Sequence, residues 1–318
     1  MCFRFCVAAL ALGTLAVAVG CETTVDVDLP EHESQLVINE LFTAGEAWRV
    51  SVTASRSIRD AGAGAFPPVE DATVEIRAGG PDGRVLDTLT YDAERDVYRS
   101  FDRDTGPEQS ETYAIRVSAP GFSGVAEAVG RAPAPVPLGS LSRGEAPEPE
   151  QTEIDVQLTD PEGRDDYYTL SVYQQAVRSD TVGLQVELSF SSTSPLLQEN
   201  AQEQFIDDGP GEVRTTYYDG ALFSDTAFEG ETRRMSIRFT ADNIGDLPPD
   251  VEKRTVVVLT SLSEDRYEYR RTLRLSERTG ENPFSEPVQI HSNVRGGLGI
   301  FAGAARVGRV VLREGASP

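Results

Sequence analysis

Strict alternation of apolar and polar residues runs through most of this chain of 318 residues. Residues 182–190 give the longest example, in which the apolar positions are Val182, Leu184, Val186, Leu188 and Phe190. Successive side chains of a β-strand point to opposite faces, so such runs predict strands with one buried and one solvated face. The fold class predicted for the chain is therefore all-β.

The first half of the chain contains about seven such runs, separated by turns rich in glycine, proline and aspartate. This number and spacing predict an immunoglobulin-like β-sandwich over residues 35–132. The runs are Leu36–Phe42, Trp48–Ala54, Ala72–Arg77, Val85–Tyr91, Val97–Phe101, Tyr113–Ser118 and Gly124–Val129.

Residues 133–150 are rich in proline and acidic residues and have little periodicity, which predicts a semi-rigid linker. Residues 151–318 then predict a larger β-domain. Its expected strands lie at 154–158, 168–172, 182–190, 235–239 and 256–259, with closing strands at 288–292, 298–302 and 306–312.

One segment of the second half departs from the β pattern and predicts a helix at about residues 263–278. Ser261 and Glu264 have the spacing of a capping box, in which two side chains bond the free amides of a helix start. Tyr269 and Leu273 share one face of such a helix. The C-terminal domain is therefore expected to carry one amphipathic helix.

The N-terminus has the pattern of a bacterial lipoprotein signal. Residues 1–20 combine Arg4 with an apolar stretch and end in Ala18-Val19-Gly20, directly before Cys21. This predicts a signal peptide that is removed, lipid attachment to Cys21, and a solvated tether over residues 21–34. An ordinary signal peptide cleaved elsewhere is the alternative.

The composition narrows the classes of partner. With 52 acidic and 29 basic residues the net charge is −23, which disfavours binding to nucleic acid. Cys2 and Cys6 lie within the predicted signal peptide, so only Cys21 remains. The sequence therefore predicts neither a disulfide framework nor a cysteine-based catalytic or metal site.

The two histidines give little support for catalysis. His32 falls in the predicted tether and His291 in a predicted strand, and the Gly-x-Ser-x-Gly spacing of a nucleophile is absent from the sequence. We therefore expect no enzymatic activity, no cofactor and no metal. A glycan-active hydrolase with two facing carboxylates stays an alternative, because acidic residues are abundant.

Two acidic loops offer the oxygen ligands that calcium prefers, at residues 160–166 and 207–211. Neither has the spacing of a helix–loop–helix calcium site. Turns on an acidic surface are the favoured interpretation of both.

Residues 191–234 are long, polar and interspersed with aromatic residues, as in many binding loops. We expect a surface for a glycan or peptide ligand here. Its candidate residues are Tyr217, Tyr218, Phe223, Asp225 and Phe228.

Several motifs resemble those of the domain-of-unknown-function 4249 (DUF4249) family of Bacteroidetes-type envelope lipoproteins. They span nearly the whole of the expected mature chain. They are Asp26–Pro30 with Leu36–Ile38, Phe223–Asp225 with Phe228–Gly230, Asn282–Val288 and Ser292–Gly303.

The resemblance implies a protein of the outer membrane, held there by its N-terminal lipid and encoded in many genomes beside a TonB-dependent transporter. It implies no catalytic residues. On this basis we expect an accessory or binding protein that assists the transporter in substrate capture. A structural or adhesive surface module is the alternative.

Overall fold

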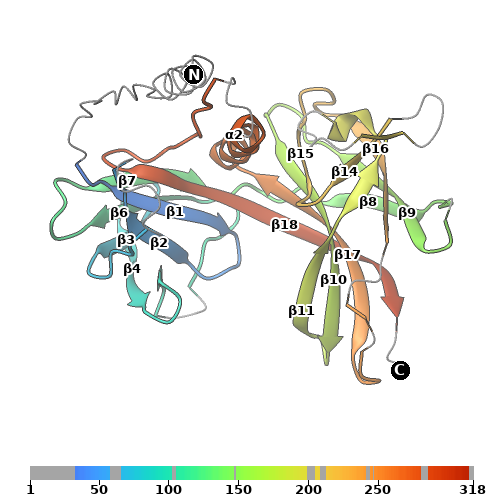
Figure 1. Cartoon of the computed structure of the whole chain (residues 1–318), viewed down its shortest axis with the longest axis horizontal. Coiled ribbons are helices and arrows are strands. Elements are labelled where there is room, and N and C mark those ends of the chain that lie inside the picture. The colour runs from blue at the N-terminus through green and yellow to red at the C-terminus, as the bar shows by residue number, and fades with distance from the viewer. Residues whose placement is uncertain are drawn as a thin grey trace, which may run out of the picture. The chain divides into compact units, whose positions relative to one another are not determined.

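A computed structural model describes residues 33–57, 66–101, 105–146, 148–198, 205–207, 213–240, 244–245, 247–280 and 286–314 (Figure 1). The predicted signal peptide, Cys21 and most of the predicted tether lie outside these residues. β-Strands dominate the described part of the chain, which contains one α-helix. The predicted all-β class with a single helix is confirmed.

Each of the alternating runs in the first half forms a strand. Neighbouring strands within this half pair antiparallel. They are β1 (Leu36–Thr43), β2 (Arg49–Ala54), β3 (Thr73–Ala78), β4 (Val85–Asp92), β5 (Val97–Arg99), β6 (Thr112–Ser118) and β7 (Ala126–Arg131).

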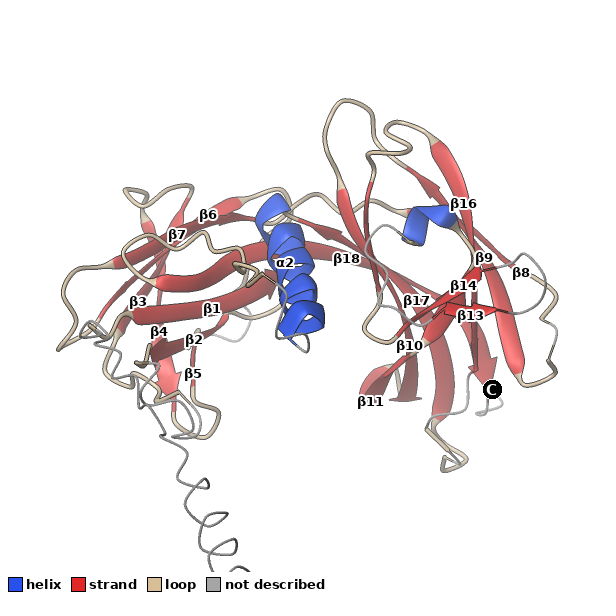
Figure 2. Cartoon of the chain, turned by 45° about the horizontal axis from the view of Figure 1, so that its top comes forward, coloured by secondary structure: helices blue, strands red, loops and turns tan. Residues whose placement is uncertain are grey.

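The second half contributes further strands and the helix (Figure 2). The strands are β8 (Leu138–Arg143), β9 (Gln151–Thr159), β10 (Tyr167–Arg178), β11 (Thr181–Leu188), β12 (Phe190–Ser192), β13 (Phe205–Asp207), β14 (Val213–Tyr217), β15 (Ala221–Ser224), β16 (Thr232–Thr240), β17 (Glu252–Leu262) and β18 (Leu298–Glu314). The helix is α2 (Glu264–Gly280), and Pro195–Leu197 form a short 3-10 turn.

The strands form two sheets. One contains twelve strands, with the order β11-β10-β17-β18-β1-β2-β5-β4-β3-β6-β7 and with β15 paired to β10. The other contains six strands, in the order β13-β14-β12-β16-β9-β8. Because β18 pairs with both β17 and β1, the larger sheet is continuous between the two halves of the sequence.

Strand β18 crosses the boundary that the sequence predicts between the two domains. It runs parallel to β1, where Val37 pairs with Leu298 and Thr43 with Ala304. Its Phe301 lies in the N-terminal core, 4.8 Å from Phe42 between ring centroids. The predicted sandwich over 35–132 is thus completed by C-terminal residues, which local periodicity does not reveal.

The predicted linker at 133–150 contains strand β8, which pairs with β9. Leu138 is 1% exposed and belongs to the C-terminal core. Pro133, Pro135 and Pro137 precede the strand, and its apolar side chains Leu138 and Leu141 anchor it. It is therefore part of the fold rather than a free connection.

Two other strand predictions need correction. The run at 182–190 divides at Leu188, because Phe190 passes into β12 of the other sheet. Residues 288–292 form no strand, and the last two predicted strands are one continuous strand, β18.

Three hydrophobic clusters support the sheets in the described part of the chain, and two of them are large. The N-terminal core centres on Trp48, which lies 5.1 Å from both Phe42 and Tyr113 between ring centroids. The C-terminal core contains side chains of both sheets, among them Leu170, Val257 and Ile237.

Helix α2 packs on the larger sheet and begins differently from the prediction. The Ser263 hydroxyl, not that of Ser261, accepts a hydrogen bond from the Arg266 amide at 3.3 Å. The Ser261 hydroxyl accepts one from the Val136 amide instead. In the described part of the chain, no helix has both the length and the apolar character needed to cross a bilayer.

Candidate functional site

Most of the residues predicted to form a contact surface lie in the protein interior. Tyr217, Phe223, Asp225 and Phe228 are at most 2% exposed, whereas Tyr218 is 55% exposed. Four of the five therefore cannot form a contact surface in this fold. The prediction is corrected for those four, and Tyr218 stays a surface candidate.

The cause is that this long polar stretch contains core strands. Tyr217 stacks on Phe190 at 5.1 Å, and its hydroxyl donates to the Leu197 carbonyl at 2.8 Å. Phe223 of β15 packs on Tyr168 at 5.3 Å. Aromatic residues among polar ones here mark short strands, which sequence alone does not distinguish from an exposed loop.

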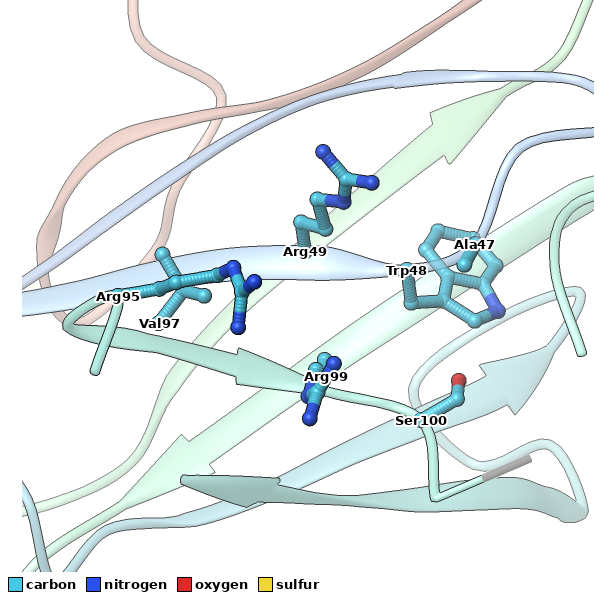
Figure 3. A pocket seen from close by; sticks show the side chains of 7 residues that line it. All are labelled: Ala47, Trp48, Arg49, Arg95, Val97, Arg99 and Ser100. Carbon is cyan, nitrogen blue, oxygen red and sulfur yellow. The ribbon is translucent and has the colours of Figure 1, made fainter. Parts of the chain in front are cut away.

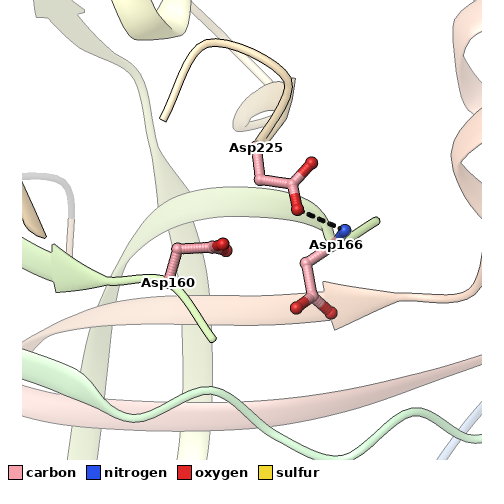
Figure 4. Close-up of side chains that lie close together, drawn as sticks. All are labelled: Asp160, Asp166 and Asp225. Carbon is pink, nitrogen blue, oxygen red and sulfur yellow. Dashed lines mark hydrogen bonds between the residues drawn. The ribbon is translucent and has the colours of Figure 1, made fainter. Parts of the chain in front are cut away.

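The fold instead gathers three aspartates into one buried cluster (Figure 4). Asp160 directly follows β9, Asp166 directly precedes β10, and Asp225 directly follows β15. One carboxylate oxygen from each lies within 4.8 Å of the others. We call Asp160, Asp166 and Asp225 the aspartate cluster.

Strand pairing brings the aspartate cluster together. Tyr167 pairs with Ser224 in the β10–β15 ladder, which places Asp166 beside Asp225. Asp160 arrives from the other sheet, because the turn at 160–166 carries the chain from β9 to β10. The cluster therefore lies where the two sheets connect.

Hydrogen bonds hold the carboxylates in place. Asp160 accepts from the Tyr168 hydroxyl at 2.5 Å and from the Gly230 amide at 2.9 Å. Asp225 accepts from the Asp166 amide at 2.7 Å, and Asp166 accepts from Arg164 Nε at 2.7 Å. Four of the six carboxylate oxygens thus have internal donors.

Burial changes the acidity of the cluster. It raises the pKa of Asp225 to about 6, and the nearby Asp160 and Asp166 add to this effect against a hydrogen bond from the Asp166 amide. Burial also raises the pKa of Asp166 and that of Tyr168. These shifts follow from the cost of placing charges of one sign in a poorly solvated site.

The cluster has the donor chemistry of a site for a hard cation. Carboxylate oxygens are the ligands that calcium prefers, and Asp166 also lines an open pocket of about 420 Å³. The loop at 160–166, one of the two acidic loops identified in the sequence, supplies two of the three aspartates. The second loop, 207–211, lies mostly outside the described residues.

The cluster does not have the geometry of a glycosidase. Such enzymes hold two carboxyl groups about 5–9.5 Å apart across an open cleft. Here the oxygens lie within 4.8 Å, and the three residues are 2–7% exposed. This cluster therefore does not supply the acid–base pair of the hydrolase alternative.

His291 contacts helix α2 through its imidazole ring. Its Nε2 is 2.8 Å from Asp265 Oδ1 on α2. Asn293 donates to the other oxygen of Asp265 at 3.2 Å and accepts from the Phe301 amide at 3.0 Å. His32 lies outside the described residues.

Close contacts with neighbouring backbones explain the glycines of the segment Ser292–Gly303. Gly299 has a φ of +107°, and a Cβ there would lie 1.9 Å from the Ile38 carbonyl oxygen. At Gly303 a Cβ would lie 2.2 Å from the Arg131 carbonyl oxygen. This motif therefore lets β18 approach the backbones of β1 and β7.

A family model described as "Domain of unknown function (DUF4249)" matches residues 22–309. No curated protein matches the chain.

Solved structures give only distant likenesses. A mutant of Salmonella alpha-2-macroglobulin has 14% identity over 77% of this chain and 15% of that one, with a TM-score of 0.24. Trypsin-activated alpha-2-macroglobulin from Escherichia coli has 13% identity over 78% and 16%, with a TM-score of 0.24. A DUF4785 family protein of Legionella pneumophila has 10% identity over 72% and 51%, with a TM-score of 0.22. The chain spans only about 15% of the length of the first, and similarity this low carries no argument.

Proposed function

The chain belongs to the DUF4249 family, and from this premise we propose that it is a lipid-anchored, non-catalytic binding protein of the bacterial outer membrane. In this role it assists a TonB-dependent transporter in capturing a substrate. The observation that carries the proposal is Cys21, which ends an apolar segment directly after three small residues. The family match begins at the next residue, Glu22.

The side chains considered as catalytic candidates are engaged in contacts within the fold. Within the described residues, the contacts of His291 are with Asp265 and the helix, and no serine hydroxyl is among them. The residues of the aspartate cluster are 2–7% exposed, and four of their six carboxylate oxygens accept hydrogen bonds from internal donors. Both arrangements serve the structure.

Anchoring can be tested with two serine variants. In cells fed labelled palmitate, we expect the wild-type chain and Cys6→Ser to carry the label and to sediment with membranes. Cys21→Ser should carry no label and should leave the membrane fraction, because the diacylglycerol is attached to this sulfur. Equal labelling and sedimentation of Cys21→Ser would contradict the proposal.

The transporter partnership has its own test. Affinity purification of the tagged, lipidated chain should recover an outer-membrane receptor in stoichiometric amount. Consistent recovery of a secretion or adhesion component in its place would favour the structural or adhesive alternative.

A further inference from the structure

Two arginines occupy directly opposite positions of a strand pair in the N-terminal half. Arg49 of β2 is the paired residue of Arg99 of β5. Directly opposite residues of an antiparallel pair have Cβ atoms about 5 Å apart, and like charges at such positions are destabilising. In a chain with 52 acidic residues, this pairing needs an explanation.

A third arginine joins them at a pocket. Arg95 lies in the turn between β4 and β5, and the three arginines line a cavity of about 260 Å³ together with Trp48 and Val97 (Figure 3). Ala47 and Ser100 complete the lining. We call this the arginine pocket. It combines a cationic rim with an aromatic and an aliphatic side chain.

The nearby carboxylates do not balance this charge. Asp92 lies 3.0 Å from Arg95 and 3.1 Å from Arg99 and is shared between them. Glu94 is 3.8 Å from Arg95, but its side chain is 88% exposed. One shared, half-buried carboxylate and one solvated carboxylate therefore face three guanidinium groups.

Arg49 is the least compensated of the three. No carboxylate in the described part of the chain lies within ion-pair distance of its guanidinium. Glu40 interacts with it only at longer range, and burial raises the pKa of Glu40 to about 8. Burial therefore favours the uncharged form of Glu40, which reduces the negative charge near Arg49.

Guanidinium groups have the geometry to bind an oxyanion. Their planar forks donate two parallel hydrogen bonds to a carboxylate or a phosphate. A bound anion between Arg49 and Arg99 would turn the unfavourable pairing into a favourable one. We propose that the arginine pocket binds a small molecule through a carboxylate or phosphate group, with Val97 contacting its apolar part.

This inference gives the proposed binding function a ligand class, but it does not depend on the lipid anchor or on the transporter. Loss of anchoring with retained anion binding would reject the proposed function and leave this inference standing. Retained anchoring with loss of anion binding would reject this inference alone.

The single tryptophan of the chain lines the pocket and reports on it. We would titrate the full chain, purified in detergent, with inorganic phosphate and separately with succinate, and follow Trp48 emission and the heat of binding. Sodium chloride at equal ionic strength is the control. We expect a saturable response to at least one oxyanion and none to chloride. The stronger of the two responses identifies the group that the pocket prefers.

Substitutions locate the response. Arg49→Gln and Arg99→Gln should each weaken oxyanion binding at least tenfold, because each removes one guanidinium group and its two parallel hydrogen bonds. Arg116→Gln is the matched control: this arginine lies on β6 of the same half, pairs with Glu127 at 3.4 Å and is outside the pocket. Its affinity should equal that of the wild type.

Two results would overturn the proposal. One is the absence of saturable heat and emission change with both oxyanions in the wild-type chain. The other is unchanged affinity in a folded Arg49→Gln/Arg99→Gln double variant, with circular dichroism establishing that the variant is folded.

Discussion

The aspartate cluster and the arginine pocket each gather three side chains of one charge, but they differ in surroundings. The aspartates are 2–7% exposed, and four of their six oxygens accept hydrogen bonds from within the protein. The arginines line an open pocket, where Arg49 and Arg99 oppose each other across two strands.

The difference follows from acid–base chemistry. A buried carboxyl relieves repulsion by retaining its proton, as the raised pKa of Asp225 shows. A guanidinium remains protonated at any ordinary pH, so an arginine cluster needs solvent or an anion instead. Repulsion within the aspartate cluster can therefore be relieved by protonation inside the fold. Repulsion within the arginine pocket is relieved by solvent or by a bound anion.

The largest effect is expected from removing a fully bonded carboxylate of the aspartate cluster. Asp160→Ala leaves the Tyr168 hydroxyl and the Gly230 amide without their acceptor and should lower the free energy of unfolding by about 3 kcal/mol. Urea denaturation measures this change. Asp250→Ala, which removes a carboxylate that is 66% exposed, should change it by at most about 0.5 kcal/mol. Equal effects of the two substitutions would show that the cluster is not structural.

A smaller effect is expected from the titration of Asp225. Burial raises its pKa in the folded state to about 6, above the ordinary aspartate value of 3.8, so the folded state binds the proton more tightly. The resulting stability is fully present below about pH 4 and is lost as pH rises through about 6. Asp225→Asn should make the thermal midpoint less dependent on pH between 4 and 7. An unaltered pH profile in that variant would contradict the assignment of this pH dependence to Asp225.

The next effect should have the opposite sign. In buffer free of phosphate and carboxylate, Arg49→Gln should raise the free energy of unfolding by about 0.5 kcal/mol, because it removes a like charge opposite Arg99. At a saturating oxyanion concentration the wild-type chain should instead have the higher free energy of unfolding, because it binds the anion more tightly. A variant less stable than the wild type without any anion would mean that Arg49 is stabilised within the fold.

The smallest effect is expected from calcium. Most oxygens of the aspartate cluster already accept internal hydrogen bonds, so 1 mM calcium should shift the thermal midpoint at pH 7 by less than about 1 °C. Magnesium at the same concentration is the control. A calcium-specific shift of several degrees, abolished by Asp166→Asn, would make the cluster a calcium site.

The strands were predictable because periodicity is a local property. Val74 and Ile76 are buried within an alternating run, and a period of two places them on one face of β3. The pairing of β1 with β18 was not predictable in this way, since its partners are separated by most of the chain. The glycines at 299 and 303 are the local sequence feature linked to this pairing. Their role becomes clear only from the structure, where the backbones at Ile38 and Arg131 lie against them.

The sites show the same limit. The turn at 160–166 was recognisable from Asp160-Pro161-Glu162-Gly163, but the approach of Asp225 depends on the β10–β15 pairing. Arg49 and Arg99 gave no signal in the sequence, because neither belongs to a known motif. Their register across β2 and β5 is what reveals the pocket.

The most direct test of this contrast is an anomalous difference map from crystals of the protein grown in selenate, a tetrahedral oxyanion. We expect a selenium peak between the guanidinium groups of Arg49 and Arg99, and none at the aspartate cluster. A map without a peak in the arginine pocket, at selenate concentrations that saturate other surface sites, would contradict the account.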